Sequence, residues 1–129
     1  MSRLLIIEED PISVDIIERV GARMGYHVEV LNSLRFVDIP FEVERLGGFD
    51  IIVSEAILPN SNGLTLFGDL RRRWPQTKLV VTSDGSLNDQ LRDELFVAAL
   101  QVGAHCTLCK PLLDDELSAC FSSVGGLAA

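Results

Sequence analysis

Side chains able to bind a cation and an oxyanion follow several short apolar runs of this sequence. Carboxylates that gather in one place repel one another unless a cation neutralises them. Hard oxygen ligands beside a lysine suit Mg²⁺ together with an oxyanion, because Mg²⁺ takes few carboxylates and keeps several waters. The set comprises Glu8, Glu9 and Asp10 after the first run, Glu55 after the third, Thr82, Ser83 and Asp84 after the fourth, and Lys110 after the fifth.

The apolar runs themselves predict five strands. Four of them are short and lack polar alternation, as is typical of strands buried on both faces of a parallel sheet. These four are Leu4–Ile7, Ile51–Val53, Leu79–Val81 and, more weakly, Cys106–Cys109. Tyr26–Leu31 is the fifth candidate strand.

Segments with helical periodicity separate these runs. Asp10-Pro11 is a strong start signal, because aspartate caps a helix and proline suits its first position. Pro40 lies inside the segment Leu34–Leu46, so we expect that helix to be short, late or kinked. Apolar stripes mark the other helices at Ile16, Ile17, Val20 and Met24, at Phe67, Leu70 and Trp74, at Leu87, Leu91, Leu95, Ala98 and Val102, and at Leu113, Leu117, Phe121 and Val124.

This alternation predicts a doubly wound α/β sandwich. Ligands of such sheets bind outside the carboxyl ends of the strands. We therefore expect the polar strand-end residues to meet at one edge of the sheet.

Length and charge narrow the possible functions. The chain has 129 residues, enough for one domain with a single core. Its 11 basic and 19 acidic residues give a net charge of −8, which argues against binding to nucleic acid or to an anionic membrane. No apolar run approaches the ~20 residues of a membrane span. Three cysteines fit a reducing compartment, so we expect a cytoplasmic domain.

Cys106 and Cys109 have the spacing of redox and zinc motifs. Residues three apart on a strand point to opposite faces, and the chain has no second Cys/His pair to complete a tetrahedral site. We therefore expect structural cysteines, and we treat His27 and His105 as non-catalytic.

From Arg3 to Val124 the chain resembles the receiver domain of two-component response regulators. The resemblance covers nearly the whole sequence and rests on motifs at four strand ends. They are Leu5-Ile6-Ile7-Glu8-Glu9-Asp10-Pro11, the segment from Glu55 through Pro59 to Asn62-Gly63, a hydroxyl at Ser83 or Thr82, and Gly103-Ala104 before Lys110-Pro111.

The resemblance implies a flavodoxin-like (βα)5 three-layer sandwich with a parallel five-stranded sheet in the order 2-1-3-4-5. It implies a receiver domain over residues 1–124, followed by a flexible tail over 125–129, and a cis Lys110-Pro111 bond. It places Glu55 at the phosphoacceptor position, Ser83 or Thr82 with Lys110 in the phosphoryl pocket, Thr107 at the switch position, and Glu8, Glu9, Glu55 and the backbone carbonyl of Ile57 around a metal.

Departures from the family pattern bear on activity. Glu55 replaces the family's aspartate, and its extra methylene moves the carboxylate roughly 1.3 Å further along. A misplacement of ~1 Å can cost ~100-fold in rate, so Glu55 is a poor nucleophile. Glu9 is also lengthened, so we expect Mg²⁺ to bind weakly or not at all. Thr107 replaces an aromatic residue, which removes the usual switch coupling.

We therefore expect a non-enzymatic signalling module that works without phosphorylation. The resemblance implies contact with a histidine kinase, output domain or effector protein through the predicted fourth helix, fifth strand and fifth helix (Leu87 to Val124). A homodimer is a further expectation. Two alternatives remain: a competent receiver that accepts a phosphoryl group with Mg²⁺, and a structural dimerisation domain with a vestigial pocket.

Overall fold

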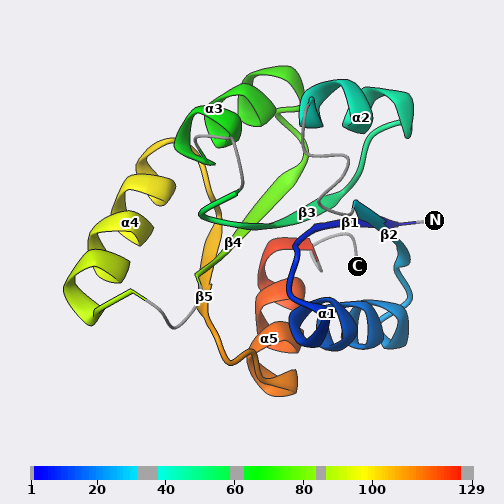
Figure 1. The fold of residues 1–129 in the computed structure, drawn as a ribbon. Coiled ribbons are helices and arrows are strands. Elements are labelled where there is room, and N and C mark those ends of the chain that lie inside the picture. The colour runs from blue at the N-terminus through cyan, green and yellow to red at the C-terminus, as the bar shows by residue number, and fades with distance from the viewer. Residues whose placement is uncertain (1, 32–37, 59–62, 84–86, 126–129) are drawn as a thin grey trace.

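A parallel sheet lies between two layers of helices, as Figure 1 shows. The computed structural model describes residues 2–31, 38–58, 63–83 and 87–125. Asp84, most of the turn before Gly63 and most of the predicted tail lie outside these ranges. The strands are β1 (Arg3–Ile7), β2 (His27–Leu31), β3 (Ile51–Glu55), β4 (Lys78–Ser83) and β5 (Cys106–Cys109). The helices are α1 (Pro11–Arg23), α2 (Ile39–Arg45), α3 (Gly63–Arg73), α4 (Asp89–Gln101) and α5 (Asp114–Gly125).

The sheet has the order β2-β1-β3-β4-β5, and every neighbouring pair is parallel. The predicted fold and strand order are therefore confirmed. Helices α1 and α5 cover one face, while α2, α3 and α4 cover the other (Figure 1). The central strands β1, β3 and β4 are buried almost throughout, which explains their continuous apolar runs.

Capping side chains define where the helices begin. Asp10 caps α1 and accepts hydrogen bonds from the backbone N–H groups of Ile12 and Ser13. Asp38 caps α2, which starts one residue before Pro40 and has only seven residues. The prediction of a short, late second helix is confirmed, because proline fits the first turn and not the interior.

The predicted apolar stripe of α4 is wrong at most of its positions. Leu91 is 50% exposed and Val102 is 36% exposed, whereas Ala99 is completely buried and Leu95 packs against the core. Leu95 belongs to the predicted stripe, but the buried face continues through Ala99 and not through the predicted Ala98, because each helical residue turns the direction of the side chain by about 100°. Because apolar residues lie on both sides of α4, their pattern did not indicate which side is buried.

Within the described ranges, no helix is long and apolar enough to cross a membrane.

Candidate functional site

The carboxyl edge of the sheet brings four of the predicted site residues together. Glu8 follows β1, Glu55 ends β3, Thr82 lies near the end of β4, and Lys110 follows β5. Side chains alternate between the faces of a strand, and the apolar residue two positions before each of these four packs beneath α1 and α5. The alternation therefore directs all four side chains to that side of the sheet.

Lys110 is paired with two carboxylates. Its Nζ lies 2.9 Å from Glu8 Oε1 and 3.4 Å from Glu55 Oε1. The side chains are almost completely withdrawn from solvent, with exposed fractions of 9% for Lys110, 1% for Glu8 and 11% for Glu55. The backbone N–H of Lys110 donates to the carbonyl of Ser83 at 3.0 Å, and the Lys110-Pro111 bond is cis, as predicted.

Both carboxylate oxygens of Glu8 have hydrogen-bond partners. Its Oε2 accepts hydrogen bonds from the backbone N–H groups of Glu9 at 3.1 Å and Asp10 at 3.2 Å. The hydroxyl of Thr82 donates to its Oε1 at 3.4 Å. These hydrogen bonds and the contact with Lys110 compensate for the burial of the Glu8 carboxylate.

Burial and the charge of Glu8 raise the pKa of Glu55 to about 7, although Lys110 acts in the opposite direction. Burial acts to lower the pKa of Lys110, but Glu8 and then Glu55 outweigh it, and the pKa rises above its ordinary value. Lys110 therefore stays charged, whereas Glu55 is divided between its acid and carboxylate forms near neutral pH.

Of the two hydroxyl candidates, Thr82 makes the contact with Glu8. Thr82 also pairs in register with Glu55 across β3 and β4. Ser83 is the next residue along β4 and is buried, and the alternation of the strand directs its side chain to the opposite face. Thr107 is half-buried on β5, in register with Val81.

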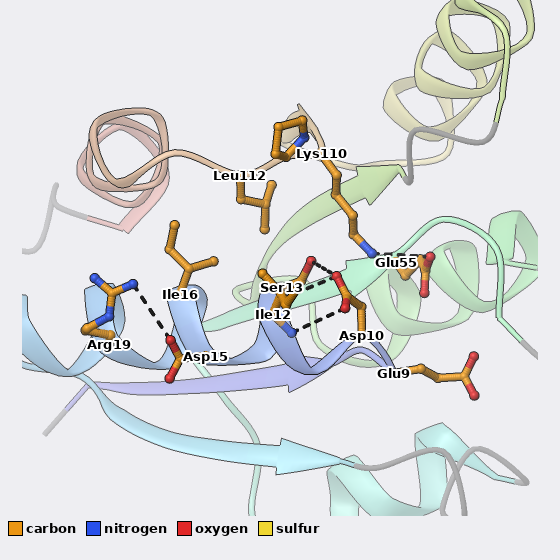
Figure 2. Close-up of a pocket in the computed structure, with 11 residues that line it drawn as sticks. Glu9, Asp10, Ile12, Ser13, Asp15, Ile16, Arg19, Glu55, Lys110 and Leu112 are labelled. Carbon is orange, nitrogen blue, oxygen red and sulfur yellow. Dashed lines mark hydrogen bonds and ion pairs between the residues drawn. The ribbon is translucent and has the colours of Figure 1, made fainter.

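Glu9 and Asp10 do not join the cluster around Lys110. The side chain of Glu9 is exposed and extends away from Glu55 in Figure 2. Asp10 accepts a hydrogen bond from the Ser13 hydroxyl at 2.7 Å, which lowers the pKa of Asp10. Asp10 is therefore used to cap α1, as its place before Pro11 predicts.

The carboxylate side chains at this edge of the described structure do not gather around one point. Among the described residues, no three Asp, Glu, His or Cys side chains are placed to share a metal. Glu8 is engaged on both oxygens, Glu9 extends outward, and Glu55 contacts an ammonium group. Lys110 supplies the positive charge that faces Glu8 and Glu55.

A groove of about 760 Å³ lies between α1 and the turn from β5 to α5, beside the Lys110 cluster. Ile12, Ile16 and Leu112 form its apolar wall, and Glu55 and Lys110 lie at its polar end (Figure 2). This groove was not predicted from the sequence. The available signal was Ile12, an apolar residue four positions before Ile16 but outside the predicted core stripe. In the structure Ile12 is 79% exposed.

A family model for the response regulator receiver domain matches residues 4–122. The chain belongs to this family. It is a receiver domain of a two-component response regulator, and the position of Lys110 after β5 and of Glu55 at the end of β3 agrees with the predicted motifs.

Curated relatives of this receiver domain are distant. It is 28% identical over 118 residues to the transcriptional regulatory protein TcrA of Mycobacterium tuberculosis, covering 91% of this chain and 43% of TcrA. It is 25% identical over 116 residues to the two-component response regulator EHD1 of Oryza sativa subsp. indica, covering 90% of this chain and 32% of EHD1. The receiver domain therefore spans less than half the length of either relative.

Solved structures share the fold. A response regulator from Thermotoga maritima superposes with a TM-score of 0.78 at 19% identity, over 96% of this chain and 97% of that one. A CheY-like receiver domain protein from Methanospirillum hungatei gives a TM-score of 0.76 at 20% identity, over 95% of this chain and 92% of that one.

Proposed function

We propose that this receiver domain is a phosphorylation-independent signalling module that acts by protein–protein contact. The observation that carries the proposal is the pairing of Lys110 with Glu8 at 2.9 Å and with Glu55 at 3.4 Å. A lysine that would bind a phosphoryl oxygen is already neutralised by two carboxylates of the chain itself. A phosphoryl group would have to displace one of these buried pairs.

The length and environment of Glu55 support the same conclusion. Its carboxylate lies roughly one methylene, about 1.3 Å, beyond the place an aspartate would reach. Its pKa of about 7 leaves part of the population protonated at neutral pH, and a protonated carboxyl group is a weak nucleophile. Phosphoryl transfer depends on positioning and charge neutralisation, and both are altered here.

Weak or absent binding of Mg²⁺ is part of the same proposal. Mg²⁺ would neutralise the charge of an incoming phosphoryl group and orient it. We expect Mg²⁺ to bind weakly or not at all, because Glu8, Glu9 and Glu55 are not arranged around a common point. The carbonyl of Ile57 remains the family's fourth ligand position, on the loop after β3.

The contact surface we favour is the face formed by α4, β5 and α5. The exposed apolar side chains of Leu91, Val97 and Leu100 on α4 support this choice, because apolar side chains left outside a core can be buried by a partner. The partner would be a histidine kinase, an output domain, an effector protein or a second copy of the chain. The excess of acidic residues argues against nucleic acid as the partner of this domain.

Intact-mass measurement after incubation with acetyl phosphate or phosphoramidate and Mg²⁺ tests the proposal. We expect no phosphate adduct on the wild-type chain and one adduct on Glu55→Asp, since the shorter side chain returns the carboxylate to the aspartate position. Glu55→Asp/Lys110→Ala is the matched control and should lose the adduct. A single adduct on the wild type would overturn the proposal and favour the competent receiver.

A further inference from the structure

A cationic surface lies where α3 ends and β4 begins, at the edge of the sheet opposite to the Lys110 cluster. It is formed by Arg71, Arg72, Arg73 and Lys78. These are four of only 11 basic residues in a chain whose net charge is −8. Residues 70–83 and 95–113, which carry the end of α3, β4, the turn before β5 and β5 itself, include no acidic residue. Positive charge is therefore concentrated in one place on an otherwise acidic molecule.

Arg71 is fixed in this surface by contacts with two other parts of the chain. Its Nη1 donates hydrogen bonds to the carbonyls of Pro75 at 2.8 Å and Thr77 at 3.4 Å, directly before β4. Its aliphatic stem crosses Gly103 in the turn before β5, where an added Cβ would lie only 2.5 Å from Arg71 Cγ. Among the described residues, neither Arg71 nor Lys78 pairs with a carboxylate. Both charges are therefore open to an anion from another molecule.

His105 brings a further polar group to the same place. Its backbone N–H donates to the carbonyl of Leu79 at 2.8 Å, and its Nδ1 accepts from the backbone N–H of Leu79 at 3.0 Å. The imidazole therefore lies beside the start of β4. Burial, and then the charges of Arg71 and Lys78, lower the pKa of His105, as expected for a ring near two cations.

Arg72 and Arg73 supply the accessible part of the surface. Their side chains are 74% and 51% exposed. Arg72 pairs with Asp69, and Arg73 lies 3.7 Å from Glu44 of α2. Exposed ion pairs contribute little stability, so a carboxylate of another molecule can replace these partners at little cost.

This charge exceeds what the end of a helix needs. Basic residues near a helix C-terminus interact favourably with the helix dipole. α1 and α2 each have one basic residue in the last turn, α4 and α5 have none, and α3 has three. Lys78 belongs to the following strand, so the dipole of α3 does not account for it.

We propose that this cationic surface binds a carboxylate-rich segment of a partner protein. Its arginines lie on α3, outside the face formed by α4, β5 and α5. The inference therefore goes beyond the proposed function and does not depend on it.

The chemistry of the surface favours carboxylates. The planar N–H fork of arginine matches the two oxygens of a carboxylate, and three of the four cations are arginines. The pairs that Arg72 and Arg73 form within the chain have the same chemistry. A nucleic acid fits less well, because its long row of phosphates would also meet the acidic remainder of the molecule.

Trp74 is a natural reporter for this surface. It is the only tryptophan of the sequence, and it packs against the core. The guanidinium of Arg73 lies 5.4 Å from the centre of its ring. A carboxylate that binds Arg73 alters the electrostatic field at the indole, so the fluorescence emission of Trp74 should respond to binding here.

Fluorescence titration with a glutamate-rich peptide tests the proposal. The anisotropy of a fluorescein-labelled peptide measures the affinity, and the emission of Trp74 with unlabelled peptide locates the binding. We expect saturable binding at low salt that weakens as the ionic strength rises, together with a change in Trp74 emission. A glutamine-rich peptide of the same length should not bind.

Arg72→Gln/Arg73→Gln is expected to weaken peptide binding about tenfold, because it removes the two accessible guanidinium groups. Arg19→Gln/Arg23→Gln on α1 is the matched control, since it removes the same number of charges at exposed positions. The control should keep the wild-type affinity within about twofold. Melting temperatures identify a variant with a folding defect, and the wild-type emission of Trp74 locates the binding even in that case.

Other results would overturn the inference. These are no saturable binding to the wild type, an equal loss of affinity in both double variants, and binding that leaves the Trp74 emission unchanged. Tighter binding of a single-stranded DNA of the same length as the peptide would also overturn it, because the surface would then be assigned to nucleic acid.

Discussion

The ammonium group of Lys110 lies 2.9 Å from the carboxylate of Glu8, and both side chains are almost completely buried. The two residues follow β5 and β1, which are separated in the sheet by β3 and β4. The pair therefore ties together the carboxyl ends of strands that are not neighbours. Removing one member of a buried pair leaves the other charge uncompensated, which is far more costly than losing a surface contact.

Lys110→Met is expected to destabilise the protein by about 3 kcal/mol or more at pH 8, because Glu8 and Glu55 would then face each other without a cation. The loss of stability caused by Lys110→Met should be smaller at pH 5.5, where Glu8 and Glu55 can share a proton. Urea unfolding at the two pH values measures both effects. Lys78→Met is the control. Lys78 is the only other lysine of the sequence, and it begins β4, at the edge of the sheet opposite to the Lys110 cluster. An equal loss at both pH values would contradict this account.

Glu55→Gln is expected to stabilise the protein above pH 7. The folded pKa of Glu55, about 7, lies above its ordinary value of 4.5, so the folded state binds more protons than the unfolded state between these values. Stability contributed by Glu55 is therefore present below about pH 4.5 and lost as the pH rises through 7. The free energy of unfolding of Glu55→Gln should exceed that of the wild type by on the order of 1–3 kcal/mol at pH 8, and by much less at pH 5.

Melting temperatures of wild type and Glu55→Gln across this pH range measure the difference, in buffer without divalent cations. Glu116→Gln, at an exposed position on α5, serves as the control for the loss of one negative charge. A difference that stays constant with pH would show that Glu55 does not titrate in this range.

Magnesium is expected to leave the wild-type protein nearly unchanged. A ligand that binds only the folded state raises the melting temperature, so a shift of less than about 1 °C in a few millimolar Mg²⁺ indicates weak binding or none. Glu9→Asp/Glu55→Asp shortens two carboxylates and should produce a larger shift. The comparison is made at constant ionic strength. A clear wild-type shift that disappears in Glu8→Gln would contradict the expectation.

His105 is expected to make the protein less stable in mild acid. Its Nδ1 accepts a hydrogen bond from the backbone N–H of Leu79 at 3.0 Å, which requires that nitrogen to be unprotonated. Burial, and then the charges of Arg71 and Lys78, lower the pKa of His105 below its ordinary 6.5. The unfolded state then binds more protons, so stability falls as the pH drops below about 6.5 and through the folded pKa.

His105→Asn tests this effect, since the amide oxygen can accept the same hydrogen bond without titrating between pH 7 and 5. The melting temperature of the variant should fall less than that of the wild type over that range. His27→Asn, at an exposed position on β2, is the control and should follow the wild type.

Local patterns predicted most of the fold. All five predicted strands are present, and the continuous apolar runs mark the central strands β1, β3 and β4 most clearly, because a strand buried on both faces needs apolar side chains at nearly every position. Asp10-Pro11 and Pro40 predicted where α1 and α2 begin, since capping and proline geometry depend only on nearby backbone. The phase of α4 was wrong because its apolar residues lie on both sides of the helix, and only packing against the sheet selects Ala99.

The sequence by itself determined which chemical groups reach the carboxyl edge, because every parallel strand delivers its final residues there. Tertiary structure alone decided their partners. Lys110 contacts Glu8 and Glu55 but not Glu9. Neighbouring residues of a strand point to opposite sides, so Glu8 faces Lys110 while the side chain of Glu9 extends outward. Cys106 packs in the layer beneath α1 and α5, whereas Cys109 contacts Arg92 of α4, because side chains alternate between the two faces of β5.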